Sequence, residues 1–143
     1  MQEDGARQGV RRVPHPDMTH VTPAGASAED VLERFTAALN RHDLPAALAL
    51  TSNNCVFEAS WPPPAGERSI GHTELEVAWK RAFDDLSGHL TIEESFTAGE
   101  SFMAGTRVVQ RWRYDWAGGY VRGVEVSTVR DGLITEKLAY VKG

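Results

Sequence analysis

Cysteine is almost absent from this 143-residue chain, which has Cys55 alone. One cysteine cannot form an internal disulfide or a cysteine-rich metal site, so we expect no metal. Cys55 opens a predicted strand, where a buried structural thiol is the ordinary interpretation and a nucleophile is the alternative. Low cysteine use is typical of a reducing compartment and favours a cytoplasmic location.

Long apolar runs and an excess of positive charge are also missing. No segment reaches the ~20 apolar residues of a membrane span, and the N-terminus lacks an apolar stretch of signal-peptide length. Fifteen Lys and Arg stand against 20 Asp and Glu, a formal net charge of -5. Sequence-independent binding to nucleic acid needs clustered cations. We therefore expect an unexported protein that binds neither membrane nor nucleic acid.

The common catalytic motifs are absent too. There is no glycine-rich phosphate loop, no His-Glu-x-x-His and no Gly-x-Ser-x-Gly, so nucleotide, zinc and serine-hydrolase functions lack support. The length, with 41% hydrophobic and 24% charged residues, predicts one globular domain. Residues 1–26 are rich in Pro and Gly and poor in apolar residues, which predicts a disordered tail before a domain over 27–143.

Three helices are predicted first. Ser27 and Asp30 form a capping pattern before an apolar face that runs to Asn40, and Asp43 can cap a short helix over 45–50. The third helix has the clearest helical spacing, behind a capping box at Thr73 and Glu76, with an apolar face at Leu75, Ala78, Trp79, Ala82, Phe83 and Leu86.

Strands dominate the rest. One is predicted over 55–61 and is followed by a loop over 65–71. Four more follow the third helix, joined by short turns without crossover helices. This order predicts an α+β fold with the helices on one face of an antiparallel sheet.

A near-perfect tandem repeat of six residues lies over 94–99 and 100–105. Because six is even, an insertion of this length should lengthen a hairpin and leave each residue on its own face.

The last hairpin, over 120–141, has a register that its turn predicts. Asp-Gly is a typical turn dipeptide, and a three-residue loop over 130–132 sorts polar from apolar side chains, whereas a two-residue loop mixes them. The three-residue loop pairs Glu125 with Lys137 across the strands.

The preceding hairpin, with a loop over 117–119, then pairs Arg111 with Glu125. One sheet face therefore carries Arg111, Glu125 and Lys137 as a row of charge. The other face carries Trp112, Val124 and Leu138, followed by Tyr114 and Tyr140. From periodicity alone, the row could line a site or could be a set of solvent-facing ion pairs.

These features together resemble the nuclear transport factor 2-like superfamily, and within it the SnoaL-like group that is akin to ketosteroid isomerase, polyketide cyclases and limonene epoxide hydrolase. The resemblance rests on the helices over 31–50 with Arg41-His42-Asp43, on Val56-Phe57-Glu58, on Gly71 before the third helix, and on 124–141 with Asp131-Gly132-Leu133-Ile134. It covers nearly all of the chain from Ser27 onward.

The resemblance implies a cone-shaped, cystatin-like roll whose curved sheet wraps around three N-terminal helices and encloses a pocket. It implies a small-molecule ligand and no cofactor, with Arg111, Glu125 and Lys137 as catalytic residues. The expected pocket lining is Phe35, Leu39, Phe57, Trp79, Phe83, Arg113, Val121, Gly123 and Ala139. Ala139 stands where the epoxide hydrolases have an Asp, which disfavours their mechanism.

Two classes of function follow. The first is a cofactor-independent acid/base isomerase or cyclase on a small apolar substrate of polyketide, steroid or terpenoid type, with Glu125 moving the proton and Lys137 and Arg111 stabilising negative charge. The second is a non-catalytic ligand-binding or dimerisation module. A pocket-facing charge row would leave the opposite sheet face uncovered, so a homodimer through Trp112, Val124, Leu138 and Tyr140 is expected.

Overall fold

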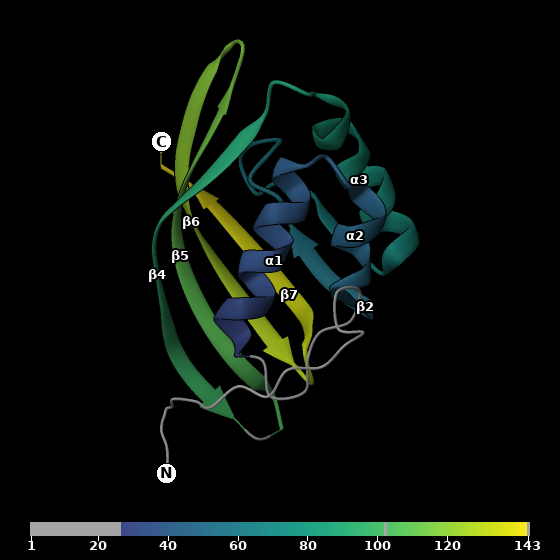
Figure 1. Cartoon of the computed structure of the whole chain (residues 1–143), viewed down its shortest axis with the longest axis vertical. Helices are drawn as coiled ribbons and strands as arrows, with labels where there is room; N and C mark the ends of the chain where they lie inside the picture. Colours follow the sequence, from purple (N-terminus) through teal and green to yellow (C-terminus); the bar gives the residue numbers. More distant parts are fainter. Residues whose placement is uncertain (1–26, 102, 143) are drawn as a thin grey trace, which may run out of the picture.

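The computed structural model describes residues 27–101 and 103–142, and it confirms the α+β class. Three helices lie on one side of a six-stranded sheet that curves around them (Figure 1). The strand order is β3-β2-β7-β6-β5-β4. The predicted tail, 1–26, lies outside the described residues. The strands are β2 (Thr51–Glu58), β3 (Arg68–Ile70), β4 (His89–Ser101), β5 (Gly105–Trp116), β6 (Gly119–Arg130) and β7 (Leu133–Val141).

The first two helices begin at the predicted caps. Helix α1 (Ala28–Asn40) starts with a capping box, in which Ser27 Oγ accepts from the Asp30 amide at 3.1 Å and the Asp30 carboxylate accepts from the Ser27 amide at 3.4 Å. Helix α2 (Leu44–Ala49) starts at Asp43, whose Oδ1 accepts from the Ala46 amide at 3.1 Å. These bonds satisfy amides that a helix leaves free at its first turn.

The predicted capping box of the third helix is wrong. Helix α3 (His72–Asp84) is preceded by Gly71, which has a φ of 86° and provides no side-chain cap. Glycine takes this conformation without strain, so the helix begins early and Thr73 already lies inside it. The Glu74 carboxylate instead accepts from the Ile70 amide at 2.8 Å.

The sheet departs from the prediction at its β2 edge. Strand β2 begins at Thr51 and ends at Glu58, and the predicted loop contains the short strand β3, which pairs with β2. Strand β2 also runs parallel to β7, with Phe57 opposite Lys137. A parallel partner is distant in sequence and is joined by no turn, so local turn residues carry no signal for it.

The tandem repeat lies in the β4–β5 hairpin, but it does not preserve the register. The pairing shifts between Thr97 and Gly99, so the expectation of unchanged faces is wrong. A bulge adds one unpaired residue and breaks the two-residue period.

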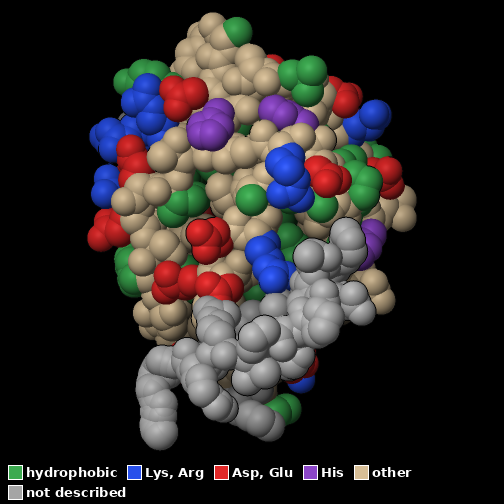
Figure 2. All heavy atoms as spheres, in the orientation of Figure 1, with side chains coloured by type: hydrophobic (Ala, Val, Ile, Leu, Met, Phe, Trp, Pro, Cys, Tyr) green, Lys and Arg blue, Asp and Glu red, His purple; other side chains and the backbone are tan. Residues whose placement is uncertain are grey.

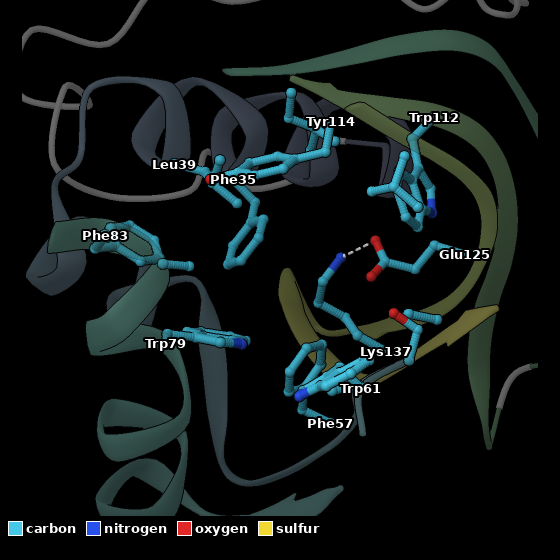
Figure 3. A pocket seen from close by; sticks show the side chains of 16 residues that line it. Phe35, Leu39, Phe57, Trp61, Trp79, Phe83, Trp112, Tyr114, Glu125 and Lys137 are labelled. Atoms are coloured by element: carbon cyan, nitrogen blue, oxygen red, sulfur yellow. Dashed lines mark hydrogen bonds and ion pairs between the residues drawn. The ribbon is translucent and has the colours of Figure 1, made fainter. Parts of the chain in front are cut away.

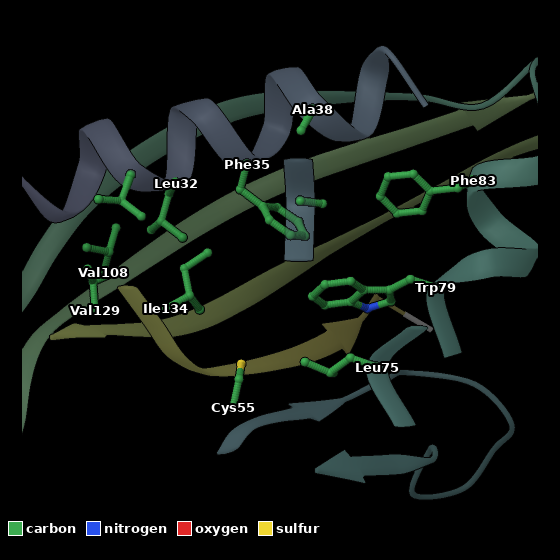
Figure 4. Close-up of a cluster of buried hydrophobic side chains, with 12 residues drawn as sticks. Leu32, Phe35, Ala38, Cys55, Leu75, Trp79, Phe83, Val108, Val129 and Ile134 are labelled. Atoms are coloured by element: carbon green, nitrogen blue, oxygen red, sulfur yellow. The ribbon is translucent and has the colours of Figure 1, made fainter. Parts of the chain in front are cut away.

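The core joins α1 and α3 to the concave face of the sheet (Figure 4). The Trp79 ring lies edge-on to Phe35 and Phe57, with centroid distances of 5.1 and 5.4 Å. Towards the start of α1, the core continues through Leu32, Val108, Val129 and Ile134, all 5% exposed or less.

Replacing Trp79 with Ala should lower the free energy of unfolding by about 3–5 kcal/mol, because it removes a large side chain that is 5% exposed. Val77 is a matched control on the same helix, since it is 69% exposed, and Val77→Ala should change stability by less than about 0.5 kcal/mol. Denaturant titration measures both, and equal midpoints for the two variants would contradict the packing.

Candidate functional site

A cavity of about 380 Å³ lies between α1, α3 and the concave face of the sheet (Figure 3). Its wall is mainly aromatic and aliphatic, and Glu125 and Lys137 are the charged residues among those that line it. The wall consists of Phe35, Leu39, Phe57, Ala59, Ser60, Trp61, Trp79, Ala82, Phe83, Leu90, Trp112, Tyr114, Val121, Glu125, Lys137 and Ala139. A mostly apolar hollow with a few convergent polar groups is the usual form of a small-molecule site.

The two charged residues form an ion pair. Lys137 Nζ lies 2.6 Å from Glu125 Oε1, and the two side chains are 5% and 13% exposed. The same ammonium lies 4.7 Å from the centre of the Phe35 ring. Figure 3 shows both side chains reaching from the sheet into the pocket. Two charges removed from water need such close partners, because desolvation would otherwise outweigh their attraction.

The predicted register of the last hairpin is wrong by two residues, and this error leaves the faces unchanged. Glu125 lies opposite Ala139, because a two-residue turn and a bulge between Thr128 and Val129 replace the three-residue loop. A shift of two keeps every side chain on its own face. Glu125 and Lys137 are therefore diagonal neighbours, which long side chains can bridge.

The preceding hairpin is wrong by one residue, and that error reverses the faces. Trp116 pairs with Gly119 across a two-residue turn, so Arg111 lies opposite Val124. Arg111 is on the outer face, where its Nη1 lies 3.4 Å from Glu93 and its Nε 3.3 Å from Glu94. The predicted row of three charges does not form, and Arg111 is not part of the pocket.

Arg113, predicted to line the pocket, also lies on the outer face. Its guanidinium donates to the Asp115 carboxylate at 3.1 Å, a bond that raises the pKa of Arg113, and it lies 3.8 Å from the centre of the Tyr120 ring. The one-residue error in the predicted β5–β6 register explains why both Arg111 and Arg113 lie on the outer face and not in the pocket.

The one-residue difference in the β5–β6 register places Trp112, instead of Arg111, on the pocket-facing side of β5. It was predicted on the outer face, yet it lines the pocket and is 8% exposed. Its ring lies over Gly123, where a Cβ would come within 2.6 Å of ring carbon Cζ2 and 2.2 Å of the Tyr140 carbonyl oxygen. Gly123, predicted to line the pocket, is not among its lining residues and lies beneath the Trp112 ring instead.

The other predicted lining residues do surround the cavity: Phe35, Leu39, Phe57, Trp79, Phe83, Val121 and Ala139. Tyr114 was predicted on the outer face with Trp112, but it lines the pocket, and burial raises its pKa. Sequence reasoning missed Trp61, which follows β2. The alternation of β5 would have indicated Tyr114 once Trp112 was placed inward, because residues two apart share a face.

Cys55 is buried in the core and outside the pocket wall, as the structural interpretation predicts. Burial raises the pKa of its thiol to about 11. Within residues 27–101 and 103–142, no group of three His, Cys, Asp or Glu is placed to hold a metal ion. No helix in the same ranges has the length and apolar character to cross a membrane.

A second hollow lies between α1 and strands β4 and β5, with Glu29, Asp30 and Glu33 in its wall. Figure 2 shows acidic side chains gathered on this side of the molecule. Glu29 accepts hydrogen bonds from Ser95 and Thr97 at 3.3 and 3.1 Å. This carboxylate therefore ties α1 to β4.

These features define an α+β roll with an apolar pocket around one buried ion pair. The chain belongs to the family of SnoaL-like domains, whose model matches residues 32–137. An NTF2-like protein of unknown function from Mesorhizobium loti is 34% identical, with a TM-score of 0.68 over 90% of this chain and 98% of that chain.

Two more distant structures share the fold. One is described as a candidate ketosteroid isomerase from Kribbella flavida, with 16% identity and a TM-score of 0.64 over 80% of this chain and 76% of that chain. The other is described as a candidate polyketide cyclase from Sinorhizobium meliloti, with 20% identity and a TM-score of 0.64 over 77% and 93%. The chain matches no protein of curated function.

Breaking the ion pair should cost more stability than replacing it. Lys137→Met leaves the Glu125 carboxylate buried without its cation, which should lower the free energy of unfolding by about 3–5 kcal/mol. The double variant Glu125→Leu, Lys137→Met removes both charges and should recover most of that loss. Denaturant unfolding of the two variants gives the comparison. If the double variant is less stable than the single one, the pair is not buried as described.

Proposed function

We propose that this protein is a cofactor-independent acid/base enzyme, of isomerase or cyclase type, that acts on a small, largely apolar carbonyl compound. The observation that carries the proposal is one carboxylate and one ammonium, 2.6 Å apart, in the wall of an otherwise apolar pocket. The names of the two distant structures support the same class of reaction.

Glu125 is the proposed proton acceptor. Its Oε1 accepts from Lys137, and among the described residues its Oε2 has no hydrogen-bond donor, so that oxygen is free to take a proton from substrate. The proton would come from the carbon next to the carbonyl, and the electrons of that C–H bond would move onto the carbonyl oxygen as an enolate forms.

Lys137 is the proposed stabiliser of the enolate oxygen. An ammonium has three N–H donors, and one of them is used by Glu125. The remaining donors can meet the charge that develops on the oxygen, and an aromatic wall that excludes water strengthens that interaction. If the substrate carries a double bond conjugated with the enolate, return of the proton from Glu125 to the far carbon would complete an isomerisation. If the enolate carbon attacks a second carbonyl of the same molecule, return of that proton to the alkoxide that forms would complete a cyclisation.

Epoxide hydrolysis is not proposed. The position opposite Glu125 on β7 is Ala139, whose methyl group lines the pocket and cannot position a water molecule. Arg111 cannot assist such a reaction in the pocket, because it lies on the outer face with Glu93 and Glu94.

Exchange of α-protons in deuterated water tests the proposal. The neutral fused-ring ketone 2-tetralone is a suitable probe, followed by NMR. The wild-type protein should accelerate exchange, and Glu125→Gln should lose about 100-fold or more of that rate, because an amide is not a base. Glu94→Gln is the matched control, since Glu94 lies on the outer face with a side chain 60% exposed. Binding of the ketone without exchange would instead establish a non-catalytic binding protein.

We also propose that two copies associate through the outer face of β6 and β7, at Val124, Leu138 and Tyr140. Val124 and Tyr140 are 36% and 55% exposed, and none of the described helices covers this face, since all three lie on the opposite side of the sheet (Figure 1). Trp112 is excluded from this surface because it faces the pocket. Exposed apolar residues grouped in this way usually mark a contact surface.

Leu138→Glu should convert the dimer into monomers, because it places a charge in the middle of an apolar contact. Sedimentation velocity at high micromolar concentration measures the change. Val77→Glu on α3, where Val77 is 69% exposed, should leave the dimer intact. A monomeric wild-type protein at that concentration would contradict the interface.

A further inference from the structure

The pocket continues outward into a groove of about 900 Å³. Four residues line both hollows: Ser60, Trp61, Val121 and Ala139. Ala139 lies directly opposite Glu125 in the sheet, so the passage begins beside the ion pair. The small side chain of Ala139 leaves room for a ligand to extend from the pocket into the groove.

The groove is walled by flat, stiff surfaces. Trp61 forms the boundary with the pocket, and Pro63, Pro64, Trp116 and Tyr140 line the groove beyond it, so the groove adjoins the proposed dimer surface at Tyr140. Trp116 is held in place by stacking on Tyr114, with ring centroids 6.1 Å apart. Trp61 is 71% exposed and is not part of the core cluster, so its position is not explained by the stability of the fold. An aromatic side chain in that setting is suited to stack on a ligand ring.

The charges of the groove indicate a neutral ligand. No Lys or Arg is among the described residues that line it, and its one carboxylate, Glu58, is paired with Arg68 at 2.6 Å. Water reaches most of the Trp61 side chain, so a ring stacked there keeps its outer side in water. A hydroxylated ring fits both conditions, because its C–H face can pack on indole while its hydroxyl groups stay hydrated.

We propose that the groove is a second subsite that binds the sugar ring of a neutral glycoside, while the apolar aglycone occupies the inner pocket beside Glu125 and Lys137. This inference rests on the part of the proposed function that gives the inner pocket a small apolar ligand. It adds the substrate class: a fused-ring compound whose polar end faces the ion pair and whose far end carries a glycosyl group.

The test compares naphthalene-2,6-diol with its mono-β-D-glucopyranoside by isothermal titration calorimetry. One hydroxyl of each probe can reach the ion pair, and the glucose of the second then points toward Trp61. The glucoside should bind the wild-type protein about fivefold more tightly than the diol, the gain typical of one stacked ring. Trp61→Ala should bring the ratio of the two dissociation constants close to one. A general weakening of the inner pocket cancels in that ratio.

Leu86→Ala is the control, because Leu86 is 77% exposed and lines neither hollow. It should leave the ratio unchanged. The subsite is refuted if the glucoside binds no better than the diol, or if the ratio survives in Trp61→Ala. A monobenzyl ether that gains more than the glucoside would overturn the assignment to a sugar. If the ratio of dissociation constants falls to about one in Trp61→Ala while Glu125→Gln shows no loss of proton exchange, the subsite is supported and the catalytic proposal alone fails.

Discussion

The ion pair between Lys137 and Glu125 is the interaction on which the chemistry of the pocket depends. An ammonium that is 95% buried must be compensated, and here a carboxylate at 2.6 Å and the face of Phe35 compensate it. The two charged residues come from the neighbouring strands β7 and β6, and the docking of α1 adds the face of Phe35. Phe35 belongs to the core and also lies against Lys137, so packing of the core completes the surroundings of the ion pair.

The register of the strands decides which residues line the pocket around the ion pair. A slip of two residues in the β6–β7 hairpin left Glu125 and Lys137 on one face, whereas a slip of one residue in the β5–β6 hairpin exchanged Arg111 for Trp112. The exchange changes the expected chemistry, because the pocket loses a cation and gains an aromatic wall. The Glu125 carboxylate is left with Lys137 as its one charged partner among the residues that line the pocket.

Much of the fold could be predicted from the sequence because its signals are local. The caps at Ser27 and Asp43 and the apolar face of α3 each depend on residues a few positions apart. The parallel pairing of β2 with β7 has no such signal, since its partners are about 80 residues apart. The lengths of the two hairpin turns were predicted wrongly. Both hairpins have two-residue turns where the sequence predicts three-residue loops, and the β6–β7 pairing also shifts between Thr128 and Val129, away from the turn residues.

Because of this register, the outer and inner faces of the sheet carry different kinds of side chain. The outer face holds arginines paired with Glu93, Glu94 and Asp115 beside an apolar strip, whereas the inner face holds the buried pair and the aromatic wall. Ala139 lines both the pocket and the outer groove, so the proposed reaction and the proposed subsite both depend on its small side chain.

The most direct test is the NMR signal of the Lys137 ammonium in protein labelled with ¹⁵N-lysine. If the ammonium is buried against Glu125 and Phe35, its protons should exchange slowly with water near neutral pH and should show nuclear Overhauser effects to the Phe35 ring. Lys80 and Lys142 are exposed and should give no such signal. Three lysine ammonium groups that exchange at the same fast rate would contradict the buried pair, and with it the proposed chemistry of the pocket.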